Sequence, residues 1–331
     1  MMSGHGAVPP LISVAIPTCL RPQLVCRAVR SALSQTLQEI EVIVVIDGRD
    51  AETAAALETF DDSRLRTITP DRQLGNADAR NLAVAHASAE WVAFLDDDDE
   101  WLPAKLDAQL RAARRSRHRL PIITCRMLAR SEAGEFLWPR RPPADGEPLS
   151  EYFFCRRTPF TGEGMVINSA ILAPRELVRA VPFRSGLERH VDPDWLLRAT
   201  RVPGAGLELV AEPEPLLIWN IEQDRHRITT SRDWRYSYQY ARSNRELMTR
   251  RGYAAFILHV VSSNAAAQRA GLAFPLLLWE SVAHGRPAAV DVASHTANFL
   301  LPARVQHAIA RWFARFHRSR LPPARPDAAP R

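Results

Sequence analysis

Four consecutive aspartates, Asp96 to Asp99, are the strongest chemical feature of the sequence. They directly follow an apolar segment, Trp91–Leu95, which we expect to be a buried strand. Adjacent carboxylates repel one another unless water or a cation neutralises them, and such hard oxygen ligands suit Mg²⁺ or Mn²⁺. Mg²⁺ commonly takes one or two carboxylates and completes its shell with phosphate oxygens and water. The alternative is a solvated acidic turn that caps the following helix, because carboxylates favour a helix N-terminus.

A second pair of acids, Asp192 and Asp194, lies at the start of a predicted helix from about Pro193 to Arg201. A carboxylate in this position could remove a proton from an attacking hydroxyl group while a cation stabilises a departing diphosphate. Both acids could instead be ordinary helix caps. The roles of His190 and His226 also have two alternatives, since each histidine could contact a phosphate or be a structural residue.

Apolar runs alternate with helical patterns over the first hundred residues. The predicted strands are Leu11–Ile16, Glu41–Ile46, Leu65–Thr69 and Trp91–Leu95, and the predicted helices are Pro22–Thr36, Ala51–Phe60 and Asn76–Ala87. This alternation indicates an α/β fold with a mainly parallel sheet and helices on both faces. Ligands of such sheets bind beyond the carboxyl ends of the strands, where Thr18, Arg21 and Asp47 stand.

Two common nucleotide-binding loops are missing from these strand ends. Neither a G-x-G-x-x-G turn nor a G-x-x-x-x-G-K-[ST] loop follows any of the four runs. Dinucleotide dehydrogenases and P-loop NTPases depend on those loops to hold phosphate. Their absence argues against both classes.

The pattern changes after about residue 110. Further strands are predicted at Ile122–Met127, Met165–Asn168 and Leu207–Val210, and a proline-rich loop at Trp138–Pro148. From Asp233 the pattern is helical to the end of the chain, and the last predicted helix is Ala303–Arg320. We therefore divide the chain into residues 1–225, an α/β domain, and residues 226–331, a helical extension.

The composition is that of a globular protein. The 331 residues are 46% apolar and 24% charged, which excludes a disordered or collagen-like chain. The richest apolar window, Leu272 to Val282, is interrupted by Pro275 and Glu280 and falls short of the roughly 20 residues that span a bilayer. The N-terminus lacks the features of a secretory signal, so we expect cytoplasmic residence and reduced cysteines.

The charge is unevenly distributed between the two parts. Residues 1–224 carry 26 basic against 32 acidic side chains, a net −6, whereas residues 225–331 carry 17 against 5, a net +12. All basic residues except Lys105 are arginines, which suit bidentate contacts to phosphate. The basic last helix could lie on an anionic membrane surface, bind a partner, or dock on the α/β domain.

Five segments, in order, resemble the inverting GT-A glycosyltransferases of family 2, which use nucleotide-diphosphate sugars. They extend over about two-thirds of the chain and are Ser13–Thr18, Glu41–Gly48, Gly75–Asn81, Phe94–Trp101 and His190–Arg198. Two departures stand out. The family often has Asp-Asp-Gly-Ser after the second strand, where this chain has Ile46-Asp47-Gly48-Arg49, and Val191 replaces a glutamate that commonly precedes the catalytic aspartate.

The resemblance implies a GT-A fold and a role for each matched residue. Asp192 would be the catalytic base, and Asp98 would bind Mn²⁺ or Mg²⁺, with Asp97 as the spacer of the Asp-x-Asp signature. The nucleotide sugar would be bound by Thr18, Asp47, Arg80 and Asp96.

The implied function is transfer of a sugar, with inversion, from a nucleotide-diphosphate donor to a hydroxyl group of a glycan or lipid-linked acceptor, as in bacterial cell-surface glycan assembly. No nucleic-acid partner is expected, and peripheral contact with the inner face of the membrane would suit a lipid-linked acceptor. The alternatives are a sugar-phosphate nucleotidyltransferase, which would need a glycine-rich first turn that Thr18–Arg21 lacks, and a non-catalytic binder of nucleotides or nucleic acid.

Overall fold

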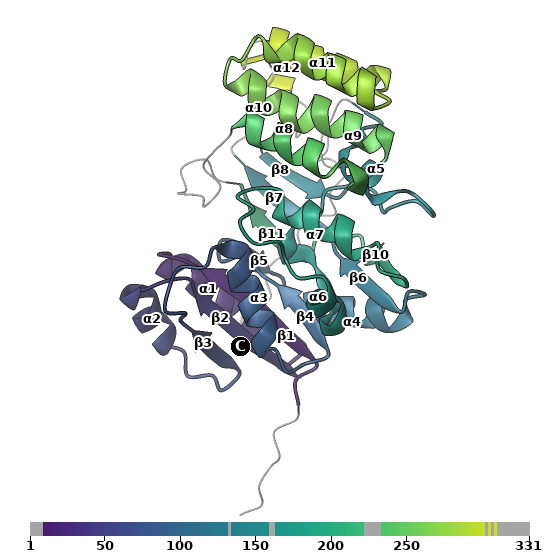
Figure 1. Cartoon of the computed structure of the whole chain (residues 1–331). Coiled ribbons are helices and arrows are strands. Elements are labelled where there is room, and N and C mark those ends of the chain that lie inside the picture. Colours follow the sequence, from purple (N-terminus) through teal and green to yellow (C-terminus); the bar gives the residue numbers. More distant parts are fainter. Residues whose placement is uncertain are drawn as a thin grey trace, which may run out of the picture.

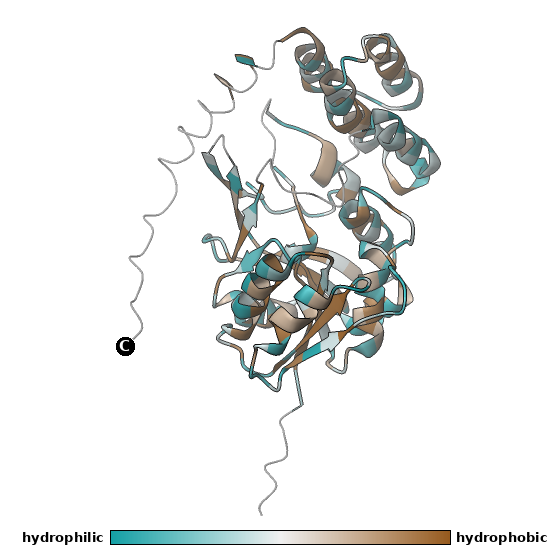
Figure 2. Cartoon of the chain, turned by 90° about the vertical axis from the view of Figure 1, so that its left-hand side faces the viewer, coloured by the Kyte–Doolittle hydropathy of each residue, from teal (hydrophilic) through white to brown (hydrophobic). Residues whose placement is uncertain are grey.

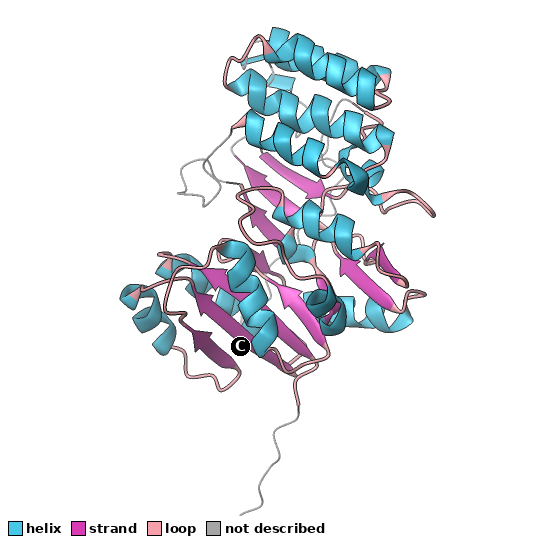
Figure 3. Ribbon diagram, in the orientation of Figure 1, coloured by secondary structure: helices cyan, strands magenta, loops and turns pink. Residues whose placement is uncertain are grey.

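The computed structural model describes residues 9–131, 134–158, 163–221, 233–301, 304–305 and 308–309. Strands and their covering helices occupy one end of the molecule, and helices alone gather at the other end (Figure 1, Figure 3). The expected α/β fold with a helical C-terminal extension is confirmed.

A seven-stranded sheet forms the centre of the α/β part. Its strands are β1 (Ile12–Thr18), β2 (Ile40–Ile46), β3 (Leu65–Ile68), β4 (Trp91–Phe94), β6 (Leu120–Thr124), β9 (Leu172–Pro174) and β10 (Ala205–Leu209). They lie in the order β10-β6-β9-β4-β1-β2-β3. Only β9 runs antiparallel to its neighbours, β4 and β6, among these strands. The carboxyl ends of β1, β2 and β4 consequently meet at one edge, which carries Thr18, Asp47 and the acidic turn.

Both faces of this sheet are buried. Val42 and Val44 of β2 belong to one hydrophobic core, and Ile43 and Val45 belong to another, because alternate side chains of a strand point to opposite faces. The helices of this part are α1 (Pro22–Leu33), α2 (Ala51–Glu58), α3 (Asn76–His86), α4 (Lys105–Arg115), α6 (Arg175–Ala180) and α7 (Val191–Ala199). The apolar strands are visible as brown arrows between the helices in Figure 2.

A second, smaller sheet was not predicted. It contains β5 (Glu100–Trp101), β11 (Leu217–Asn220), β7 (Met127–Ser131) and β8 (Gly134–Trp138), in that order. Its strands are short, and β5 comes directly after the four aspartates. Pairing between β5 and β11 fixes the far side of the acidic turn, and the expected loop follows β8 and leads to α5 (Leu149–Phe154).

The C-terminal elements are helical, as predicted. They are α8 (Trp234–Ser243), the 3₁₀ turn η2 (Arg245–Leu247), α9 (Arg250–Phe256), the π turn η3 (Ile257–Val261), α10 (Ser262–Ala267), α11 (Ala273–His284) and α12 (Ala289–Leu300). They share a hydrophobic core that also takes in Phe154 and Leu197 from the α/β part. Within the described residues, none of the helices combines the length and apolar character that crossing a bilayer requires.

Some predicted elements differ from the structure. The strand expected at Met165–Asn168 is wrong, because Asn168–Ala170 form a 3₁₀ turn (η1) and the paired strand β9 begins at Leu172. Asn168 is held by a hydrogen bond to a distant helix, which ends the extended segment there. Most of the last predicted helix, Ala303–Arg320, and all of the segment around His226 lie outside the described residues. All four cysteines are free, two of them buried.

Candidate active site

The four aspartates at the end of β4 alternate between exposed and buried. The side chains of Asp96 and Asp98 are 30% and 22% exposed, whereas Asp97 and Asp99 are buried. Asp97 and Asp98 lie in a turn after β4, which the Asp99 N–H closes by donating to the Asp96 carbonyl at 3.1 Å. The exposed pair therefore has the spacing of the Asp-x-Asp signature.

The two buried aspartates are bound by side chains from other elements. Thr18 Oγ1 donates to Asp97 Oδ2 at 2.8 Å, and Arg21 Nη1 donates to Asp97 Oδ1 at 3.0 Å. Burial raises the pKa of Asp97 to about 6, although Arg21 opposes this. Burial likewise raises the pKa of Asp99 well above its usual value, with the charges of Asp98 and Asp96 adding to the effect. These contacts lock the turn so that Asp96 and Asp98 remain at the surface of the site.

Arg80 brings a buried positive charge to the same place. It lies on α3, is 1% exposed, and its Nη2 forms an ion pair with Asp96 Oδ1. The guanidinium lies 5.7 Å from the centre of the Phe183 ring. Its Nε and Nη1 have no hydrogen-bond partner among the described residues. A guanidinium with unused donors suits the oxygens of a phosphate.

Asp192 faces this cluster from the N-terminus of α7. Asn168 donates to both of its carboxylate oxygens, from Nδ2 to Oδ1 at 2.6 Å and from the backbone N–H to Oδ2 at 3.3 Å. Burial raises the pKa of Asp192 to about 6; the charge of Asp96 adds to the effect and that of Arg80 opposes it. A carboxylate with a raised pKa is a stronger base than an ordinary one, and it still carries its charge at neutral pH.

The two other candidates near α7 are structural. Asp194 is fully buried and accepts from Arg198 Nε at 2.8 Å and from the Tyr240 hydroxyl at 3.2 Å. His190 has a backbone φ of 65° and its Nε2 lies 2.9 Å from Ser237 Oγ on α8. Burial lowers the pKa of His190 to about 3, so it is neutral at physiological pH. This left-handed residue joins the first turn of α7 to the helical extension.

Asp47 anchors a loop. Its Oδ1 and Oδ2 accept the backbone N–H groups of Leu74 at 2.6 Å and Gly75 at 2.9 Å. Gly75 has a φ of 88°, a conformation that favours glycine, and it begins α3, on which Arg80 lies. Asp47 therefore positions the segment that carries Arg80, whatever it contacts in a nucleotide.

The residues present fit a divalent cation. Asp96 and Asp98 offer two partly exposed carboxylates, which are hard ligands of the kind that Mg²⁺ and Mn²⁺ take. Across the described part of the chain, no group of three or more His, Cys, Asp or Glu side chains is arranged to hold a metal. A cation held here would need substrate phosphate and water to complete its coordination, which is usual for Mg²⁺.

The sequence did not single out the residues that hold the predicted ones in place. Asn168 binds Asp192, Ser169 Oγ donates to Asp99 at 2.6 Å, and Asn220 Nδ2 donates to the carbonyl of Asp98 at 3.2 Å. Each pair is separated by 24 to 122 positions. No local pattern reveals such contacts, because they depend on the tertiary fold.

Comparison with known proteins identifies related sequences. A model of the family described as "Glycosyl transferase family 2" matches residues 13–181. The Escherichia coli UDP-Glc:alpha-D-GlcNAc-diphosphoundecaprenol beta-1,3-glucosyltransferase WfgD is 34% identical over 100 residues, 30% of this chain and 40% of that protein. The amylovoran biosynthesis glycosyltransferase AmsB of Erwinia amylovora is 27% identical over 210 residues, 61% of this chain and 67% of that protein. The first match thus spans less than half of that relative.

Solved structures support the same fold at low sequence identity. TarS of S. aureus, residues 1–349 in complex with UDP-GlcNAc, superimposes with a TM-score of 0.52 at 15% identity, over 91% of this chain and 79% of that one. The mannosyltransferase PcManGT from Pyrobaculum calidifontis, in complex with GDP-Man and Mn²⁺, superimposes with a TM-score of 0.50 at 20% identity. The match covers 95% of this chain and 83% of that one. These likenesses concern the fold.

Proposed function

The chain belongs to glycosyl transferase family 2, and from this premise we propose that it transfers a sugar from a nucleotide-diphosphate donor to a hydroxyl group during assembly of a bacterial surface glycan. One observation carries the proposal. Asp192, a carboxylate with a raised pKa, faces Asp96 and Arg80 at the carboxyl ends of the parallel strands. A base and a diphosphate site are thus adjacent where α/β folds bind ligands.

In the proposed reaction, Asp192 accepts the proton of the acceptor hydroxyl as its oxygen attacks the anomeric carbon. Attack from the side opposite the diphosphate inverts the configuration and needs no covalent intermediate with the protein. Asn168 holds the carboxylate by two hydrogen bonds, and so fixes its direction toward the acceptor.

We propose that residues from three strand ends and from α3 hold the donor. Asp96 contacts the ribose, the buried charge of Arg80 attracts the phosphates, and Thr18 and Asp47 lie against the base. Thr18 and Asp47 already bind Asp97 and the loop at Gly75, so they contribute the shape of the base pocket as well as direct contacts.

Metal dependence is part of the same proposal. Asp98, with Asp96 beside it, would hold Mn²⁺ or Mg²⁺, and such a cation supplies neutralising charge to the diphosphate that leaves. The occurrence of Mn²⁺ in the PcManGT complex is consistent with this assignment.

The acceptor and the location follow from the relatives by analogy. The name of WfgD specifies a diphosphoundecaprenol acceptor, and we propose a lipid-linked or glycan acceptor here. Cytoplasmic residence, membrane contact through residues 303–320, and a catalytic role for residues 1–225 belong to this proposal.

A panel of nucleotide sugars tests the function. Purified protein is incubated with Mn²⁺, each donor and a lipid-linked acceptor, and release of nucleoside diphosphate is followed. Release with one donor, abolished by Asp98→Asn, is expected. Pyrophosphate release from a nucleoside triphosphate would support a nucleotidyltransferase instead, and failure of every donor to turn over would support a non-catalytic binder.

A further inference from the structure

The helix α11 is apolar on two sides: Ala273 and Leu277 pack into the helical core, and a second set of apolar side chains faces outward. Leu272, at its N-terminal end, is 91% exposed, Trp279 is 60% exposed and Val282 is 59% exposed. Pro275, Leu276 and Ala283 are exposed as well. At 100° per residue these six positions fall within a stripe roughly 120° wide. An apolar stripe of that width normally faces a protein core, but no other part of the described chain covers this one.

The polar group of the same helix points inward. Glu280, the only acidic residue of α11, is 3% exposed. Its carboxylate accepts hydrogen bonds from the hydroxyl groups of Tyr238 at 2.7 Å and Tyr253 at 2.6 Å. The buried acid has specific partners, which indicates that the orientation of α11 is built into the fold.

The charges that remain exposed around α11 are positive. Arg269 and Arg286 are exposed on either side of the helix. The second acid of residues 247–301, Asp291, is fully buried and bound by Arg251 and His259. An anionic surface would therefore meet no exposed carboxylate from this segment.

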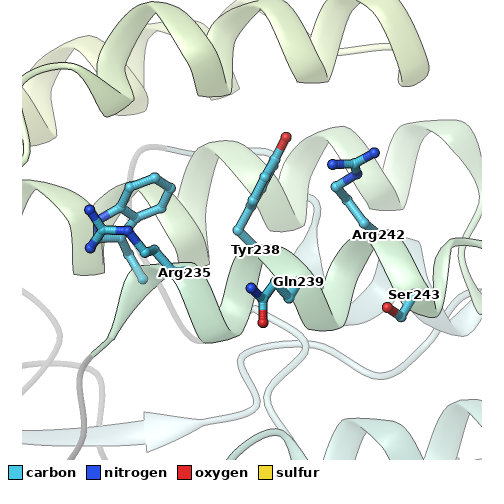
Figure 4. Close-up of a pocket in the computed structure, with 6 residues that line it drawn as sticks. Arg235, Tyr238, Gln239, Arg242 and Ser243 are labelled. Atoms are coloured by element: carbon cyan, nitrogen blue, oxygen red, sulfur yellow. The ribbon is translucent and has the colours of Figure 1, made fainter.

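The neighbouring helix α8 adds further cations. A groove of about 580 Å³ lies along it, lined by Trp234, Arg235, Tyr238, Gln239, Arg242 and Ser243. Figure 4 shows Tyr238 and Arg242 extending from the same side of α8. Tyr238 is the residue bonded to Glu280, so the groove lies beside α11. Its two exposed arginines are suited to phosphate headgroups.

We propose that the outward face of α11 (Leu272, Pro275, Leu276, Trp279, Val282 and Ala283, hereafter the α11 face) lies on an anionic lipid surface. A tryptophan within an apolar stripe, with arginines at the ends, suits the boundary between headgroups and acyl chains. A helix of 12 residues is about 18 Å long and lies in the plane of such a surface instead of spanning it.

A second copy of the chain fits this face less well. Stable interfaces bury about 800 Å² and 20–30 residues on each partner, far more than six side chains of one short helix. Two copies would also bring exposed arginines together. The lipid surface satisfies both the apolar stripe and the charge.

Co-sedimentation of the full chain with vesicles tests the inference without any transfer reaction. Binding to vesicles of phosphatidylcholine and phosphatidylglycerol is expected, and weaker binding to pure phosphatidylcholine. The double variant Leu276→Gln/Trp279→Gln should partition about a hundredfold less, since each buried apolar side chain is worth about tenfold. Arg269→Gln/Arg286→Gln should lose about fivefold per charge on the anionic vesicles alone.

Leu20→Gln is the matched control, because Leu20 is 72% exposed but lies in the α/β part, so binding should be unchanged. All these positions are exposed, and thermal unfolding should confirm that each variant is folded. Wild-type binding by the Leu276/Trp279 variant would overturn the inference and point to residues 302–331 as the lipid contact. A wild-type dimer that this variant abolishes, seen by sedimentation velocity, would overturn it in favour of a second copy.

Discussion

The two ends of this molecule treat acidic side chains in opposite ways. At the carboxyl edge of the seven-stranded sheet, Asp96 and Asp98 are left partly exposed, with arginines behind them. In helices α9 to α12 of the helical extension, the acids Glu280 and Asp291 are buried and bonded, and exposed arginines flank the outward-facing apolar groups. The first arrangement attracts cations and the second attracts anions and lipids. The buried, bonded acids of the helical extension stabilise the fold. The crowded aspartates at the edge of the sheet repel one another, so a contribution to stability does not explain their presence.

The largest effect should come from Asp192→Asn, which removes the proposed base. We expect kcat to fall by about 10²–10⁴, because general bases contribute that much, while donor affinity is kept. A turnover assay measures the loss in kcat, and calorimetry measures the affinity for the donor separately. Glu188→Gln, an exposed acid nearby, should behave as wild type. Retained turnover in Asp192→Asn would remove this residue from the role of base.

A direct contrast between the regions comes from removing one acid in each. Asp291→Ala should lower the free energy of unfolding by about 3 kcal/mol, since it leaves buried His259 and half-buried Arg251 without their partner. Asp98→Ala should leave it unchanged or raise it slightly, because repulsion within the acidic turn is relieved. Urea unfolding of both variants measures the difference. Equal destabilisation by both would show that the aspartates of the turn are structural.

The variant Asn168→Ala tests whether Asn168, which holds Asp192, also sets the pKa of that carboxyl group. Without the hydrogen bond from Nδ2, the pKa of Asp192 should rise above about 6, and the acid limb of the kcat profile should move to higher pH. Below about pH 5 the loss should approach about tenfold for each unit by which the limb moves, whereas near pH 7 a shift of one unit should cost only about twofold. The KM for donor should stay constant. A uniform loss at all pH values, without movement of the limb, would indicate a purely structural residue.

The smallest expected effect is on the pH dependence of the free energy of unfolding. This dependence has opposite signs for the buried aspartates of the two regions. Burial raises the pKa of Asp97 to about 6, so its contribution to stability declines as pH rises from about 4 to 6. Burial also works to raise the pKa of Asp291, but hydrogen bonds from His259, Ala288 and Arg251 outweigh it and lower the pKa. Stability from Asp291 is therefore lost as pH falls below about 4.

Thermal unfolding of Asp97→Asn and Asp291→Asn across this range provides the measurement. Asp97→Asn should be more stable than wild type above about pH 6 and should lose that advantage near pH 4. Asp291→Asn should be less stable at neutral pH and should approach wild type in acid. The same pH dependence in both variants would refute the contrast.

Much of the fold was predictable because it rests on local periodicity. The runs around Ile12–Thr18 and Ile40–Ile46 are apolar on both faces, which is typical of central parallel strands. The small sheet was missed because β5 has two residues and its pairing with β11 joins positions over a hundred residues apart. The resemblance pointed to Asp96 and Asp98 as a pair, but the contacts of Ser169 and Asn220 that hold the acidic turn could not be expected from the sequence.

The orientation of α11 shows a different limit of prediction from sequence. The sequence of this helix is apolar all round with one glutamate, and the residue type alone predicts that Glu280 is exposed. The structure instead buries Glu280 along with Ala273 and Leu277, because Tyr238 and Tyr253 supply hydroxyl groups to the carboxylate from two other helices. Specific hydrogen bonds to a buried charge can thus decide the orientation of a short helix against its composition.

Anomalous diffraction from crystals grown with Mn²⁺ and a nucleoside diphosphate examines the acidic turn most directly. A manganese peak should appear at the carboxylate of Asp98, with the diphosphate between it and Arg80. Manganese and diphosphate bound elsewhere, with Asp96 still paired with Arg80 and Asp98 with Arg21, would be incompatible with a cation-assisted sugar transfer at this edge of the sheet.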